Sequence, residues 1–147
     1  MNRYERKGDI SDLYEISQLE KIIFKDEAWT QEMLKIELLR NENSKTLIIE
    51  ENGRILGYLM ARSVLKEYNI INMGVFPPRQ KEGIGTMLLS NFLESIKNNS
   101  SVFLEVKKSN LNAIELYKTI GFKVFDKRKN YYKDGSSALI MNYRKVY

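Results

Sequence analysis

The fold is indicated most clearly by the stretch Phe103-Leu104-Glu105-Val106-Lys107-Lys108-Ser109-Asn110-Leu111-Asn112-Ala113-Ile114-Glu115-Leu116-Tyr117-Lys118-Thr119-Ile120-Gly121-Phe122. Residues 102–106 are apolar apart from one glutamate, which predicts a short strand. Apolar residues then recur at helical spacing through residues 113–120, and Gly121 follows where a helix commonly ends. Phe122 opens another run typical of a strand. The stretch therefore predicts a strand–helix–strand unit.

The flanking sequence extends this unit into a larger sheet. Helical periodicity predicts one helix over residues 10–24 and a second after Thr30, a favourable N-cap residue. Two strands at residues 46–50 and 55–61 flank Asn52-Gly53, the strongest short signal for a hairpin. The remaining expected elements are a strand at 68–76, a helix from about residue 83, and strands at 122–126 and 138–143. This order predicts a mixed α/β sheet with helices on both faces, in a single domain spanning residues 1–147.

The composition restricts the possible chemistry. The 147 residues include no cysteine and no histidine. Disulfides, thiolate nucleophiles, Cys/His zinc sites and histidine-based triads are therefore excluded. Acid–base chemistry near neutral pH must use a carboxylate with a raised pKa, a tyrosine, a lysine, a substrate group or water.

The charge and hydropathy patterns restrict the partners. The net charge of +5 would suit a phosphate-rich ligand, but the basic residues are scattered, so direct nucleic-acid binding is not expected. No apolar run approaches the length of about 20 residues needed to span a bilayer. The charged N-terminus has no apolar stretch behind it and does not resemble a signal peptide. We expect a cytoplasmic protein with no membrane partner.

A glycine-containing loop precedes the helix expected near residue 83. It reads Pro77-Pro78-Arg79-Gln80-Lys81-Glu82-Gly83-Ile84-Gly85-Thr86. Glycines let a backbone approach a ligand closely, and the first amides of a helix lack intrahelical partners and attract phosphate. A Walker loop is excluded because Thr86 lacks the preceding lysine, and a Rossmann fingerprint is excluded because Leu88 replaces its third glycine.

The remaining pattern is Gln/Arg-x-x-Gly-x-Gly/Ala, filled by Gln80, Gly83 and Gly85. It resembles the acetyl-coenzyme A signature of the GNAT acetyltransferase superfamily. The stretch from Leu104 to Phe122 is similar to Leu-Glu-Val-Arg-x-Ser-Asn-x-x-Ala-x-x-Leu-Tyr-x-x-x-Gly-Phe of GNAT N-terminal acetyltransferases. The segments 72–75, 128–135 and 138–141 also resemble the family, most closely its ribosomal-protein-alanine N-acetyltransferase (RimI) type.

The resemblance departs from the family pattern in two places. Trp29 follows Glu27-Ala28 where the family often has Pro-Trp, and Lys107 replaces the usual arginine. The first departure concerns peptide recognition rather than acetyl transfer. The resemblance covers most of the chain from Leu19 onward, is strong from Asn72 to Met141, and implies the GNAT fold, a mixed and mostly antiparallel sheet.

The resemblance also implies a co-substrate, acetyl-coenzyme A, and no metal. Met73 and Val75 would pair through their backbones with the pantetheine arm, and Asn110 would hydrogen-bond it. The pyrophosphate would be held by Gln80, Lys81, Glu82, Gly83, Ile84, Gly85 and Thr86. The donor for the carbonyl oxygen is not identified by the sequence.

Two residues are expected to carry the chemistry. Glu105 interrupts an apolar strand, where partial burial would raise its pKa and suit a general base; alternatively its side chain faces solvent. Tyr117 would donate a proton to the departing thiolate, since an ordinary tyrosine has a pKa of about 10; alternatively it packs in the core. Asn110 has the alternative role of a helix cap.

The substrate that accepts the acetyl group is expected to contact Trp29, Tyr131 and Tyr132. These residues would line the peptide entrance or else pack as core aromatics. The preferred substrate is the N-terminal α-amine of a protein, with the alanine of a small-subunit ribosomal protein favoured. A lysine side chain or small amine remains an alternative substrate. A non-catalytic acetyl-coenzyme A-binding module is a further alternative, and the sequence leaves the oligomeric state open.

Overall fold

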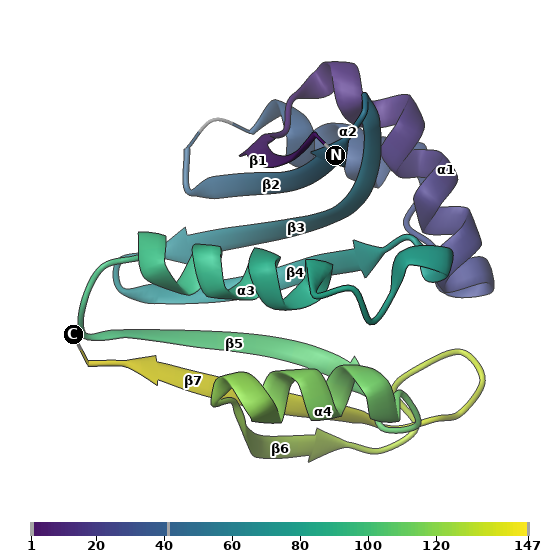
Figure 1. Cartoon of the computed structure of the whole chain (residues 1–147). Coiled ribbons are helices and arrows are strands. Elements are labelled where there is room, and N and C mark those ends of the chain that lie inside the picture. Colours follow the sequence, from purple (N-terminus) through teal and green to yellow (C-terminus); the bar gives the residue numbers. More distant parts are fainter. Residues whose placement is uncertain (1, 41, 147) are drawn as a thin grey trace.

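The computed structural model describes residues 2–40 and 42–146. Within these residues, seven strands form one sheet in the order β1-β2-β3-β4-β5-β7-β6 (Figure 1). The strands are β1 (Arg3–Lys7), β2 (Ser44–Glu51), β3 (Arg54–Val64), β4 (Glu67–Val75), β5 (Ser100–Lys107), β6 (Lys123–Arg128) and β7 (Ala138–Lys145). The helices are α1 (Leu13–Phe24), α2 (Gln31–Leu39), α3 (Ile84–Ser95) and α4 (Leu111–Ile120), with 3-10 turns η1 (Ile10–Asp12), η2 (Lys25–Glu27) and η3 (Pro77–Arg79).

Every neighbouring pair of strands is antiparallel except β4 and β5, which confirms the mixed, mostly antiparallel sheet. The parallel pairing of β4 with β5 is short, running from Glu67 opposite Ser101 to Ile70 opposite Leu104. Both strands then continue but diverge (Figure 1). Residues 71–75 and 105–107 therefore do not pair with one another, and the sheet opens at this end.

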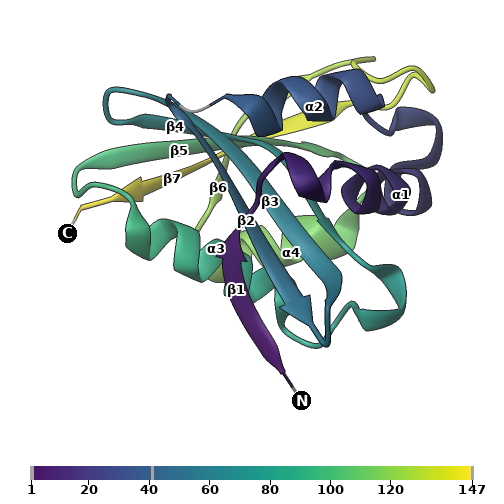
Figure 2. The ribbon, with the colours of Figure 1, turned by 90° about the horizontal axis from the view of Figure 1, so that it is seen from above.

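Helices cover both faces of the sheet, as expected. α1 and α2 lie on one face, and α3 and α4 lie on the other (Figure 2). Alternation along the central strands supplies a core to each side. On β2, Leu47 and Ile49 belong to the cluster under α3 and α4, whereas Ile48 joins the cluster under α1 and α2. The uninterrupted apolar runs of β2 and β3 are explained by this burial on both faces.

The local turn and cap signals are confirmed. Asn52 and Gly53 have φ values of 51° and 79°, the left-handed conformations that a two-residue hairpin turn requires. The hydroxyl of Thr30 accepts a hydrogen bond from the amide of Met33, 3.1 Å away, at the start of α2. Gly121 ends α4 with a φ of 127°.

Two local expectations need correction. The helix expected over residues 10–24 begins as the 3-10 turn η1 before α1 starts at Leu13. The edge strand β1 was not expected at all, since its sequence Arg3–Lys7 carries no alternating apolar pattern. Polar contacts hold it instead: Arg6 forms ion pairs of 2.8 Å with both Asp12 and Glu50. An edge strand built this way is difficult to detect from hydrophobic periodicity.

Candidate active site

The loop between β4 and α3 presents a row of free backbone amides. The amides of Arg79 and Gln80 close η3 by donating to the carbonyls of Phe76 and Pro77. Among the hydrogen bonds of the described residues, none uses the amides of residues 81–86. Gly83 caps α3 with a φ of 85°, so these amides gather at the positive end of the helix dipole. Such an arrangement suits an anionic group, as the sequence predicted.

The same loop lies against the open end of β4. A Cβ added to Gly85 would lie 2.9 Å from Leu116 Cδ2, 3.5 Å from Met73 Cε and 3.8 Å from Val75 Cγ2. The start of α3 is therefore in contact with both α4 and the part of β4 that does not pair with β5. The side-chain amide of Gln80 also donates to the carbonyl of Val75, 3.2 Å away. The predicted cofactor residues on β4 and on the loop thus form one continuous surface.

Ion pairs hold the acidic residue of this loop. Glu82 lies 2.7 Å from Arg79 and 2.9 Å from Arg3. Both arginines also bind Glu51, at 3.1 Å for Arg3 and 2.9 Å for Arg79. Arg79, and then Arg3, lower the pKa of Glu82. The negative charge of Glu82 is therefore offset by its partners, and β1 and the β2–β3 hairpin are connected to the loop.

Asn110 lies at the start of α4, which begins at Leu111, two residues before the expected Ala113. Its Oδ1 accepts a hydrogen bond from the amide of Ala113 at 3.2 Å. The helix-cap role considered for Asn110 is therefore present. The exposed side chain leaves its Nδ2 available to a ligand.

Glu105 lies immediately beyond Leu104, the last residue of β5 that pairs with β4. The expectation of partial burial is wrong, because its side chain is exposed while Leu104 and Val106 face the core. The carboxylate nevertheless has close neighbours. Its hydrogen-bonding interaction with Tyr131 raises the pKa of that tyrosine. Burial, and then the charge of Glu105, raise the pKa of Tyr132 to about 12.

Tyr117 is buried on α4, with 9% of its surface exposed. Its ring centroid lies 5.9 Å from that of Phe122. Burial, followed by the proximity of Tyr132, raises the pKa of Tyr117 to about 12, which corrects the ordinary value expected from the sequence. Tyr117 therefore packs in the core and is close enough to Tyr132 for the charge of one to affect the pKa of the other.

Trp29 lies at the edge of the core between α1, α2 and the sheet. Its backbone amide donates to Glu20, 3.0 Å away. The Glu20 side chain is fully buried and also accepts hydrogen bonds from the hydroxyl of Tyr58 and the side-chain amide of Asn72. Desolvation raises the pKa of Glu20. This carboxylate fixes the position at which the chain passes from η2 to α2.

Lys107 joins the Trp29 region to the loop that carries Tyr131 and Tyr132. Its ammonium lies 2.6 Å from Glu27 and 2.8 Å from Asp134. The same nitrogen lies 5.5 Å from the centroid of the Tyr132 ring. This cluster was not predicted from the sequence, because its members are far apart in the chain. The one local sign of it was Lys107 itself, a positive residue at the position where the GNAT pattern has arginine.

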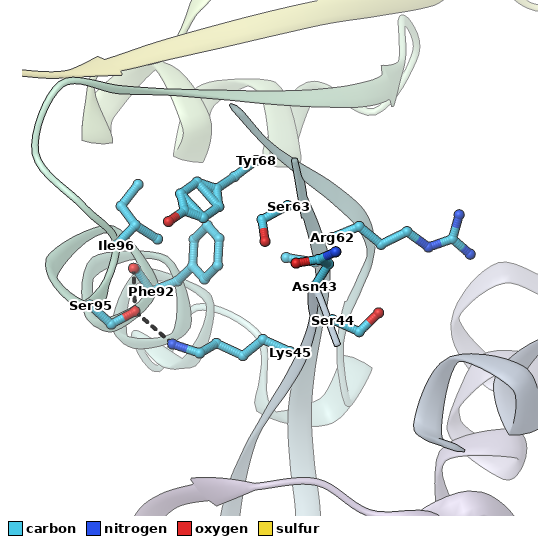
Figure 3. A pocket seen from close by; sticks show the side chains of 10 residues that line it. Asn43, Ser44, Lys45, Arg62, Ser63, Tyr68, Phe92, Ser95 and Ile96 are labelled. Carbon is cyan, nitrogen blue, oxygen red and sulfur yellow. Dashed lines mark hydrogen bonds between the residues drawn. The ribbon is translucent and has the colours of Figure 1, made fainter. Parts of the chain in front are cut away.

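A pocket lies at the opposite end of α3, near the starts of β2 and β4 and the end of β3 (Figure 3). The side chains of Tyr68, Phe92 and Ile96 border it, and Lys45 donates to Ser95 across it at 3.1 Å. It contains none of the residues predicted for the site. Free amides, the diverging ends of β4 and β5, and tyrosines come together at the end of the sheet beside the β4–α3 loop, which is therefore the candidate site.

Residues 2–40 and 42–146 contain no helix that is both long and apolar enough to cross a membrane. Within the same residues, no group of three or more aspartate, glutamate, histidine or cysteine side chains is arranged to hold a metal ion.

Comparison with known proteins places this geometry in a family. Residues 10–122 match the model of the Acetyltransferase (GNAT) family. The chain belongs to this family. A Sulfolobus acidocaldarius N-alpha-acetyltransferase is 32% identical over 121 residues, 72% of each chain. A Bacillus subtilis protein named as a putative ribosomal protein bS18-alanine N-acetyltransferase is 35% identical over 142 residues, 95% of this chain and 91% of the relative.

The solved structures agree with this assignment. The Escherichia coli ribosomal-protein-S18-alanine N-acetyltransferase superposes with a TM-score of 0.89 at 25% identity. The alignment covers 99% of this chain and 96% of that one. The chain is therefore a GNAT-type N-acetyltransferase.

The hydrogen bonds of the buried Glu20 can be tested through their effect on stability. Replacing Glu20 with leucine should lower the free energy of unfolding by about 2–4 kcal/mol, because Trp29, Tyr58 and Asn72 would lose their acceptor. Urea denaturation followed by circular dichroism measures the change. Glu20→Gln keeps an acceptor oxygen and should lose clearly less. Equal losses in the two variants would contradict this role for the hydrogen bonds.

Proposed function

We propose that this acetyltransferase modifies the N-terminal α-amine of a protein, with the N-terminal alanine of ribosomal protein bS18 as its favoured substrate. The observation that carries the proposal is the clustering of Glu105, Tyr131 and Tyr132 beside the open ends of β4 and β5. The names of relatives aligned over most of the chain support the same substrate class. Because ribosomal proteins are made in the cytoplasm, we propose that location as well.

The residues at this end fit acetyl-coenzyme A. The free amides of residues 81–86 suit its pyrophosphate, and the unpaired edge at Met73 and Val75 suits an extended arm that carries amides. Asn110 Nδ2 would add a side-chain donor. When bound, acetyl-coenzyme A supplies the acetyl group as a thioester.

Glu105 is proposed as the base. A free α-amine has a pKa of about 8 and is largely protonated at pH 7, so it must lose a proton before it can react. The exposed carboxylate of Glu105 would accept that proton directly or through water, beside the point where the strands diverge. Tyr131, whose pKa is raised by its hydrogen-bonding interaction with Glu105, would orient this carboxylate.

Tyr117 is proposed as the donor to the leaving sulfur. With its pKa raised to about 12, its hydroxyl remains protonated at neutral pH. An ordinary thiol has a pKa of about 8.5, below that of Tyr117, so complete proton transfer from Tyr117 to the sulfur would be uphill. The buried hydroxyl would therefore act mainly by hydrogen bonding to the negative charge that develops on the sulfur. The sulfur would gain a full proton only as solvent re-enters the site.

The peptide entrance is proposed between Trp29 and the loop carrying Tyr131 and Tyr132. Tyr131 is 47% exposed, and its ring lies 5.2 Å from that of Tyr132 in an edge-to-face arrangement. These aromatic faces would border the first residues of an acceptor peptide.

Peptides differing at residue one test the substrate assignment. Incubation with acetyl-coenzyme A should acetylate the α-amine of alanine-initiated peptides first, because a small first residue fits an entrance bordered by aromatic rings. Tandem mass spectrometry locates the added group. Peptides with a blocked N-terminus and a free lysine serve as the control, together with small amines such as polyamines. Acetylation confined to those controls would reject the proposal.

Substitutions at Glu105 and Tyr117 test the chemical roles. Glu105→Gln should lower kcat on the order of a hundredfold, the usual contribution of a general base, and Tyr117→Phe should also lower it strongly. Coenzyme A affinity, measured by calorimetry, should change by less than about threefold, since Glu105 is not proposed to contact coenzyme A and Tyr117 is proposed to stabilise only the charge that develops on its sulfur during the reaction.

Matched variants accompany this test. Glu115→Gln alters an exposed carboxylate on α4, and Tyr68→Phe alters a tyrosine at the opposite end of the sheet. Both should retain wild-type kcat. Wild-type turnover in Glu105→Gln and Tyr117→Phe would show that the acetyl transfer uses other groups.

A further inference from the structure

Lys107 is the cation between two acidic residues from distant parts of the chain. Glu27 belongs to η2, two residues before Trp29, and Asp134 belongs to the loop between β6 and β7. We propose that Lys107 is a positioning residue that sets the spacing between these two segments and so shapes the acceptor entrance. We call the three residues Lys107, Glu27 and Asp134 the clamp. Its effect on acceptor binding rests on the proposed function, whereas the existence of the clamp does not.

The contacts are suited to a clamp. Lys107 comes from β5, a central strand, and reaches Glu27 at 2.6 Å and Asp134 at 2.8 Å. The Lys107 and Glu27 side chains are only 27% and 24% exposed, so solvent screens their pair less than a fully exposed one. The ammonium also lies over the Tyr132 ring, which adds a cation–π contact. Three contacts therefore converge on one nitrogen.

The loop on one side of the clamp is internally braced. The amides of Tyr131 and Tyr132 both donate to the carbonyl of Ser136, at 3.0 and 3.1 Å. Asp134 Oδ1 accepts from the amide and hydroxyl of Ser136, while its Oδ2 faces Lys107. A displacement of Asp134 would therefore carry both tyrosines with it.

The segment on the other side is fixed at one end. Trp29 lies two residues after Glu27, and its amide donates to the buried Glu20. Loss of Lys107 would release Glu27 but would leave the hydrogen bond between Trp29 and Glu20 in place. The expected result is a local movement around Trp29 rather than unfolding of the protein.

Two explanations of Lys107, the charge it adds to the entrance and the positions it sets for the two segments, predict different changes in the acceptor KM. Lys107→Met removes a positive charge from the entrance, whereas the double variant Glu27→Gln/Asp134→Asn removes two negative charges. Both break the clamp. If Lys107 acted only through the local charge seen by a cationic amine, the two variants would change the acceptor KM in opposite directions. A positioning role predicts the same direction in both.

Steady-state kinetics with an alanine-initiated peptide provide the first measurement. Both clamp variants should raise the peptide KM about three- to tenfold, while kcat and the KM for acetyl-coenzyme A stay within about twofold. Lys107→Arg keeps the charge and much of the reach, and should restore the peptide KM. Lys108→Met is the matched control, since no ion pair of Lys108 occurs among the described residues. Opposite shifts in the two clamp variants would overturn the proposal.

Trp29 provides a second measurement that does not depend on activity. It is the chain's single tryptophan, so its fluorescence reports on this segment alone. Acrylamide should quench Trp29 more efficiently in both clamp variants than in the wild type, Lys107→Arg or Lys108→Met, with thermal unfolding by circular dichroism confirming folded protein. Unchanged quenching in the clamp variants would refute the clamp. Increased quenching in a protein whose wild type acetylates no peptide N-terminus would retain the clamp and reject the proposed function.

Discussion

The point at which β4 and β5 stop pairing determines where the proposed site lies in the fold. The two strands pair in parallel only as far as Ile70 and Leu104, after which each keeps its other neighbour. β4 continues against β3, and β5 continues against β7 through Lys107 opposite Ala138. Backbone groups at the diverging edges must find other hydrogen-bond partners. Water or a bound molecule with amides and carbonyls can supply those partners, which is why the pantetheine arm is proposed to lie in this opening.

Several independent features converge on this opening. The loop with free amides contacts β4 at Met73 and Val75, because glycine at position 85 allows the close approach. On the other strand, Glu105 follows directly after the last paired residue and Lys107 follows two positions later on the same face. One strand end therefore borders the proposed cofactor surface, and the other supplies the proposed base and the clamp.

Short-range patterns in the sequence predicted much of this arrangement. The Asn52-Gly53 turn, the Thr30 cap and the Gly121 helix end each depend on a few neighbouring residues, and each was confirmed. The order of strands and helices followed from periodicity, and the family from a contiguous block of motifs. β1 was not predicted, because it is stabilised by ion pairs and its sequence lacks the apolar alternation typical of a strand.

The remaining features depend on contacts that no local pattern encodes. The exposure of Glu105 results from the face that β5 turns to the core. The contacts of Lys107 join residues 80 and 27 positions away in the chain. The raised pKa of Tyr117 reflects its burial on α4 and, to a smaller extent, the charge of Tyr132, and both depend on the folded chain.

Hydrogen–deuterium exchange with and without coenzyme A tests the central claim most directly. If the opening between β4 and β5 and the adjacent loop bind the cofactor, peptides covering residues 71–75 and 81–86 should exchange more slowly when it is present. Exchange around the Figure 3 pocket, at residues 43–45 and 61–63, should not change. Protection at that pocket, with none at the loop and the β4 end, would contradict the account.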